Sequence, residues 1–80
     1  MNMFEYIMIK EQLVSPYLGS YQTFGIAAFK VEQGQRKEVA RLSDISTDRE
    51  FVSQLAVRCT AAQLHPLHLK DVAQDALAAL

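Results

Sequence analysis

The pattern of apolar residues changes once along this 80-residue chain, near residue 47, from a strand pattern to a helix pattern. Before this point, three segments rich in aromatic and β-branched residues are separated by Pro- or Gly-containing turns; they span residues 3–14, 21–32 and 37–43. After it, apolar residues recur every three or four positions over residues 47–61 and 66–79. The order predicts one α+β domain, in which a three-stranded antiparallel meander (3–43) is covered on one face by a helical pair (47–79).

Local signals mark where the two expected helices begin. Thr47 and Glu50 have the spacing of a capping box, in which each side chain binds a free backbone N–H group of the first turn. Pro66 suits the first position of the second helix, where its missing N–H group has no intrahelical partner. Leu64 and Leu69 flank that start at the spacing of a hydrophobic staple. We therefore expect helices that begin at residues 47 and 66.

The first two expected strands are apolar on both of their alternating faces, and Gly34, which can take a positive φ, forms the hairpin after them. Two short helices can cover only one face of the sheet. The other face is then expected to be buried in a homodimer or against another protein, unless the small domain simply leaves some apolar residues exposed. The candidate interaction residues are Tyr6, Met8, Tyr21, Phe29 and Val31.

Charge and cysteine content narrow the possible partners. The net charge is −1, from 8 basic and 9 acidic residues, so no strong field favours nucleic acid or an anionic membrane. Lys30, Arg36, Lys37 and Arg41 gather around the expected hairpin, but acidic residues interleave with them, as in a solvated turn. The single cysteine, Cys59, excludes an intrachain disulfide, and no stretch approaches the roughly 20 apolar residues needed to cross a bilayer. These features predict a cytoplasmic protein with neither a nucleic-acid nor a membrane partner.

The segment "LHPLHLKDVAQD" (64–75) carries the densest chemical signal of the chain. On a helix, His68, Asp71 and Asp75 would share one stripe, which could hold a divalent metal or orient the imidazole as a general base. The structural alternative is that His68 reaches back to the helix start while Asp71 complements the helix dipole. Cys59, His65 and His68 are too few for a structural zinc site, which needs four ligands. The sequence thus predicts no catalytic residue, cofactor or small-molecule ligand.

Three segments are distinctive: "FGIAAF" (24–29), "DISTDRE" (44–50) and "LHPLHLKDVAQDAL" (64–77), the last containing the motif P-x-H-L-x-D-V-x-x-D. Together they resemble a family of small uncharacterised bacterial proteins, mainly from Firmicutes, that forms a domain of unknown function. Ala76 departs from the pattern by being small where an aromatic residue is common. The resemblance supports the segment boundaries and implies no activity.

Two functions from different classes are consistent with these patterns. The first is a non-catalytic protein-interaction module that self-associates through the uncovered sheet face. The second is a small metal-dependent or acid–base enzyme that uses the stripe of His68, Asp71 and Asp75. A chain of 80 residues can hardly enclose a substrate pocket by itself, which favours the interaction module.

Overall fold

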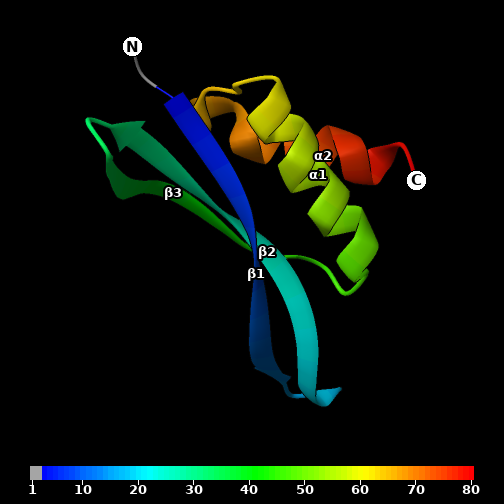
Figure 1. Ribbon diagram of the computed structural model, residues 1–80. Helices are drawn as coiled ribbons and strands as arrows, with labels where there is room; N and C mark the ends of the chain where they lie inside the picture. Colours follow the sequence, from blue (N-terminus) through cyan, green and yellow to red (C-terminus); the bar gives the residue numbers. More distant parts are fainter. Residues whose placement is uncertain (1–2) are drawn as a thin grey trace.

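The computed structural model, which describes residues 3–80, consists of a three-stranded sheet followed by two helices (Figure 1). The α+β fold and the order of its elements, predicted from the sequence, are confirmed. The strands are β1 (Met3–Ser15), β2 (Gly19–Glu32) and β3 (Gln35–Ser46), and the helical elements are α1 (Arg49–Ala61), the 3₁₀ turn η1 (Pro66–His68) and α2 (Leu69–Ala78).

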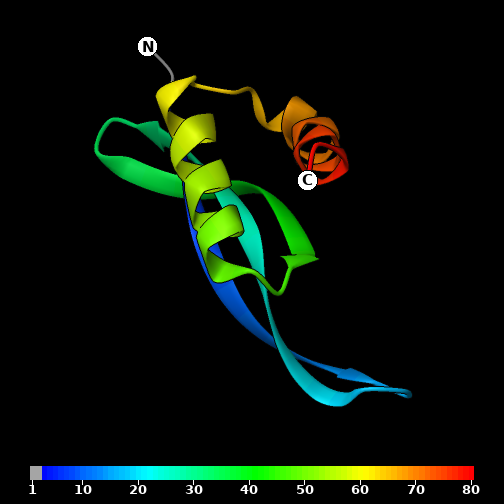
Figure 2. The ribbon, with the colours of Figure 1, turned by 90° about the vertical axis from the view of Figure 1, so that its right-hand side faces the viewer.

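The sheet is an antiparallel meander in the order β1-β2-β3. Gln33 and Gly34 join β2 to β3 with φ angles of 53° and 78°, the two positive values that a tight two-residue hairpin requires. The pairing of β3 with β2 ends at Phe24 opposite Ser46, whereas β1 and β2 continue to their own turn. Residues 11–23 therefore form a two-stranded ribbon, here called the arm, which points away from both helices (Figures 1 and 2).

Both helices pack on the same face of the sheet, as Figure 2 shows with the helices toward the viewer. Ile26 and Val52 have no exposed surface and lie at the centre of the core, and Leu69 of α2 is also buried. Alternate residues along the strands supply the sheet side of this core; they are Phe4, Tyr6, Met8, Phe24, Ile26, Ala28, Ala40 and Leu42. Cys59 is buried among them. Ile45, which follows the register shift in β3, also belongs to this core, and residues of opposite parity in the middle of β1 and β2 form the other face.

The first helix begins two residues later than the capping box predicted. Its N-cap is Asp48, whose Oδ1 accepts a hydrogen bond from the Phe51 backbone N–H at 3.2 Å. Glu50 points along the helix instead and accepts a hydrogen bond from Gln54 Nε2 at 2.9 Å. A carboxylate at this end of a helix also complements the helix dipole, so Asp48 displaces Thr47 as the cap. The prediction of a capping box formed by Thr47 and Glu50 was wrong.

The second helical segment is not one continuous α-helix over 66–79. Its first turn is the 3₁₀ turn η1, capped by His65, whose Nδ1 accepts a hydrogen bond from the Leu67 backbone N–H at 3.2 Å. His68 forms no side-chain capping bond, so His65 occupies the capping role expected of His68. Leu64 and Leu69 both pack into the core on either side of this turn, where the staple spacing placed them.

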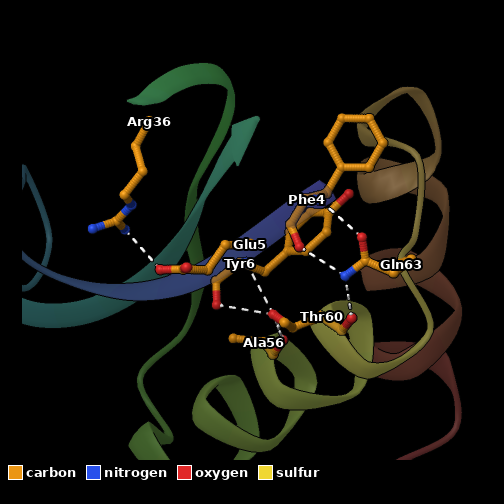
Figure 3. Close-up of polar contacts among 7 residues, drawn as sticks. All are labelled: Phe4, Glu5, Tyr6, Arg36, Ala56, Thr60 and Gln63. Carbon is orange, nitrogen blue, oxygen red and sulfur yellow. Dashed lines mark hydrogen bonds and ion pairs between the residues drawn. The ribbon is translucent and has the colours of Figure 1, made fainter. Parts of the chain in front are cut away.

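The C-terminal end of α1 is fastened to the edge of β1 (Figure 3). Gln63, with a φ of 50°, ends the helix, and the Leu64 backbone N–H donates to the Cys59 carbonyl at 3.0 Å. The Gln63 side-chain amide accepts from the Phe4 backbone N–H and donates to the Phe4 carbonyl, both at 2.9 Å. The Gln63 side chain thus takes the place of a neighbouring strand beside Phe4 of β1.

Candidate interaction surface

The face of the sheet opposite the helices carries an apolar strip, here defined as Ile7, Ile9, Ala27, Phe29 and Val31. Ile7 pairs with Ala27 in the β1–β2 register, so the strip runs diagonally over the two strands. The large side chains of the strip are half-buried, and Ala27 is 1% exposed because its larger neighbours shield it. The strip forms a continuous apolar surface on this face.

One ion pair crosses the strip, and a second lies beside it on β3. Glu5 of β1 and Arg36 of β3 form a salt bridge at 2.8 Å across the intervening strand β2. The Arg36 guanidinium also lies 4.8 Å from the centre of the Phe29 ring, a cation–π arrangement. On β3, Arg41 pairs with Glu38 at 2.5 Å, and this hydrogen bond lowers the pKa of Glu38. Glu5 and Arg36 therefore lie over the strip at Phe29, whereas Glu38 and Arg41 lie at its β3 side.

A polar network fixes the base of the arm to β3. Glu11 Oε1 accepts from the Asp44 backbone N–H at 2.8 Å, and Glu11 Oε2 accepts from the Ser43 hydroxyl at 2.6 Å. Asp44 in turn accepts hydrogen bonds from the hydroxyls of Thr23, at 2.7 Å, and Tyr21, at 3.0 Å. The bond to Asp44 is the main cause of the raised pKa of Tyr21. All four carboxylate oxygens are thereby engaged, and the network serves to orient the arm.

Gly25 makes this network possible. A Cβ atom at this position would lie 2.8 Å from Glu11 Oε1 and 2.4 Å from the Leu42 carbonyl oxygen. The β2–β3 register also shifts between Phe24 and Ile26, at a bulge, where a glycine is common. The Glu11 side chain therefore crosses β2 over Gly25 to reach β3. Sequence reasoning missed this site, although an isolated glycine inside a strand pattern is a signal of a bulge or a close approach.

The tip of the arm exposes large apolar side chains. Tyr17, Val14 and Leu18 are 96%, 80% and 74% exposed, respectively. The turn itself is ordered by Ser15, whose hydroxyl accepts hydrogen bonds from the backbone N–H groups of Tyr17 and Leu18 at 3.2 and 3.3 Å. Residues 12–29 contain no charged side chain. An ordered, uncharged and apolar tip is the kind of surface that proteins use for contacts.

The two edges of the sheet are poorly suited to pairing with a further strand. Thr60 and Gln63 occupy the edge of β1, with Thr60 Oγ1 accepting from the Tyr6 backbone N–H at 2.9 Å (Figure 3). The edge of β3 carries the charged residues Lys37 and Arg41 and a bulge opposite Ala28 and Phe29. Charges and bulges at an edge oppose strand addition. The faces of the sheet and the arm are therefore the better contact surfaces.

The structure separates the five candidate interaction residues between the two faces of the sheet. Tyr21, Phe29 and Val31 lie on the face opposite the helices. Tyr6 and Met8 lie on the helix-covered face, where Tyr6 is 5% exposed and its hydroxyl donates a hydrogen bond to the Leu64 carbonyl. Burial, and secondarily Cys59, raises the pKa of Tyr6 to about 12. Tyr6 and Met8 are thus core residues, a distinction that alternation alone could not make because both faces are apolar.

The stripe proposed from the segment 64–75 does not assemble a metal site. His68, Asp71 and Asp75 are all exposed on α2 and η1. Within residues 3–80, no three His, Cys, Asp or Glu side chains are grouped closely enough to hold a metal ion. His65 is engaged as a helix cap and packs edge-on against Phe4, with ring centres 5.4 Å apart. Of the polar residues of this segment, His65 caps the helix start.

The fold and this surface define a small α+β domain with one helix-covered sheet face, one open apolar face and a projecting arm. Residues 1–79 match the family of unknown function DUF6514, and the chain belongs to this family. No curated protein and no solved structure gives a match. None of the helices within residues 3–80 has the length and apolar character needed to span a membrane.

Proposed function

We propose that this protein is a non-catalytic interaction module that forms a homodimer through the open face of its sheet. The observation that carries the proposal is the apolar strip, which lies opposite the helices and whose neighbouring charges form ion pairs, one across the strip and one beside it. Apolar side chains and Arg are both common in protein–protein contacts. A second copy of the chain is the partner because an isologous contact buries the same strip on both molecules at once.

The ion pairs support the proposal because their charges are already neutralised within one chain. Glu5 is paired with Arg36, and Glu38 is paired with Arg41. A partner that covers the strip therefore meets no unpaired charge from these residues, whose burial would oppose binding. Both ion pairs are partly exposed and contribute little to folding by themselves. Their arrangement suits a surface that becomes covered.

The test is the mass of the protein in solution and its response to substitution in the strip. We expect sedimentation equilibrium to show a dimer at micromolar concentration. The double variant Ile7→Thr, Ile9→Thr keeps β-branched side chains and removes apolar surface, and it should weaken dimerisation at least about tenfold. Val57→Thr is the matched control, because Val57 is 65% exposed on α1, away from the strip.

Two results would contradict the proposal. One is a 9.0 kDa species throughout the micromolar range, which would leave the strip as a surface for a different protein. The other is a dimer that Ile7→Thr, Ile9→Thr and Val57→Thr weaken equally, because such a dimer would not depend on the strip. Circular dichroism of each variant confirms that the fold is retained.

A further inference from the structure

We infer that the helix-covered side of the sheet binds a small apolar carboxylate in a groove beside η1. The groove has a volume of about 350 Å³ and lies between η1 and the sheet, at the end of the molecule far from the arm (Figure 1). Its apolar walls include Phe4, Val39, Pro66 and Leu67. This volume is within the range of pockets that hold small ligands.

The apolar walls of the groove are incompletely covered by the chain itself. Leu67 is 81% exposed and Val39 is 41% exposed, whereas Phe4 and Pro66 are half-buried. Single exposed apolar side chains are normal on a protein surface, but these four line one groove. An apolar ligand in the groove would remove this surface from water, which favours binding.

The wall formed by η1 is ordered before any ligand binds. The His65 ring accepts a hydrogen bond from the Leu67 backbone N–H at 3.2 Å and packs against the Phe4 ring. Pro66, between them, has a fixed φ angle. A site that is already ordered loses less conformational entropy on binding than a flexible one.

The structure divides the four basic residues around the β2–β3 hairpin between the two faces of the sheet. Arg36 and Arg41 lie on the open face, where each forms an ion pair with a glutamate. Lys30 and Lys37 lie on the helix-covered face, directly opposite each other in the β2–β3 register. The basic cluster seen in the sequence is therefore two paired arginines on one face and a pair of lysines on the other.

The lysine pair leaves positive charge at the mouth of the groove. Lys30 and Val39 line both the groove and an adjoining hollow at the hairpin, which Lys37 also lines. Like charges directly opposite each other destabilise a sheet. Lys30 is 3.7 Å from Glu32, whereas Lys37 forms no ion pair with any residue of the described range 3–80. Two lysines and one glutamate carry a net charge that a single carboxylate would neutralise.

The apolar groove and the charged hollow together define the ligand. Its apolar body would lie against Leu67 and Pro66, and its carboxylate would lie between the ammonium groups of Lys30 and Lys37. Lysine ammonium groups are mobile point charges on flexible stems, so both can reach one head group. A neutral ligand would leave the two like charges facing each other, and a cationic ligand would add a third.

Titration with octanoate, followed by the amide chemical shifts of the protein in NMR spectra, tests the site. Octanoate, octanol and octylammonium share one chain and differ in the head group. We expect octanoate to bind with a dissociation constant on the order of 1 mM, as befits so small a ligand, and at least about tenfold more tightly than the other two. The largest shift changes should occur at Val39 and Leu67.

Two variants separate the contributions of the head group and the chain. Lys37→Gln should reduce the preference for octanoate over octanol about fivefold, because it removes one exposed charge contact. Leu67→Ser should weaken octanoate binding and keep that preference, and the exposure of Leu67 makes the substitution harmless to the core. Lys70→Gln is the matched control and should change neither, because Lys70 is an exposed lysine of α2 outside the groove.

The inference is supported by saturable octanoate binding that Lys37→Gln weakens and Lys70→Gln does not. It is overturned if octanoate shows no saturable binding up to about 10 mM, tenfold above the expected dissociation constant. Octanol binding as tight as that of octanoate, or equal losses in Lys37→Gln and Lys70→Gln, would also overturn it. The groove and the strip lie on opposite faces of the sheet, so a monomer that binds octanoate would refute the dimer alone.

Discussion

Substitution of Gly25 by alanine should destabilise the protein far more than substitution of any other glycine. The new Cβ would lie 2.4 Å from the Leu42 carbonyl oxygen, a backbone atom that cannot rotate away. For the distance between this Cβ and the Leu42 oxygen to reach a tolerable 3.0 Å, β2 and β3 must separate by at least 0.6 Å at this point. Such a movement stretches a normal ladder hydrogen bond of about 2.9 Å to the limit of bonding.

The expected loss in the free energy of unfolding is the sum of three contributions. Loss of one or two ladder hydrogen bonds costs about 1 kcal/mol each. Displacement of the Glu11 carboxylate, 2.8 Å from the new atom, loosens its bonds to Ser43 and Asp44 and adds about 1–2 kcal/mol. The reduced freedom of the unfolded chain offsets about 0.4–1 kcal/mol. We therefore expect Gly25→Ala to lower the free energy of unfolding by about 2–3 kcal/mol.

The matched control is Gly34→Ala. Gly34 has a φ of +78° and no atom within 4 Å of its virtual Cβ, so the substitution costs only backbone strain, about 1 kcal/mol. For a domain of this size, each kcal/mol lowers the melting temperature by about 4–8 °C. Melts followed by circular dichroism should therefore show a fall of about 8–24 °C for Gly25→Ala and about 4–8 °C for Gly34→Ala. Equal falls, or a larger one for Gly34→Ala, would refute the close approach of β3 and Glu11 to Gly25.

Three other predictions concern the core, the helix starts and the alkaline stability. Tyr6→Phe should lower the free energy of unfolding by about 1–3 kcal/mol at pH 8, because the Leu64 carbonyl loses its donor. Because the pKa of Tyr6 is raised to about 12, its contribution to the free energy of unfolding is complete below pH 10 and is lost as the pH rises toward 12. Between pH 8 and pH 11, urea titrations should therefore show a larger loss of stability for the wild type than for Tyr6→Phe. Equal losses in the two proteins would contradict this assignment. Leu69→Ala should lower the free energy of unfolding by about 2–5 kcal/mol because Leu69 is 3% exposed, whereas His68→Ala should lower it by at most about 1 kcal/mol. A rise in melting temperature with zinc or manganese that disappears in His68→Ala would instead indicate a metal site at His68. Asp48→Ala should lower the free energy of unfolding by about 1 kcal/mol and Thr47→Ala by much less, because Asp48 is the N-cap. Thermal melts with the opposite ranking would indicate that Thr47 caps the helix.

The sequence by itself determined the class of the fold, the order of its elements and the tight turn at Gly34. These features depend on local physics, because strand and helix periodicity, a positive φ and a helix-capping side chain are properties of short segments. The limits of local reasoning appear at the helix starts. Thr47 and Asp48 are neighbouring residues that can both cap a helix; the spacing to Glu50 favoured Thr47, whereas Asp48 is the cap in the structure.

Tertiary structure alone decided which apolar face of the sheet was covered. Tyr6 and Phe29 look equivalent in the sequence, yet Tyr6 packs beneath α1 whereas Phe29 lies on the open face under Arg36. The same holds for the contacts that join distant segments, such as Gln63 with Phe4 and Glu11 with Asp44, which are 59 and 33 residues apart. Such pairs leave no periodic signal, because they arise only when packing brings two strands, or a strand and a helix end, side by side.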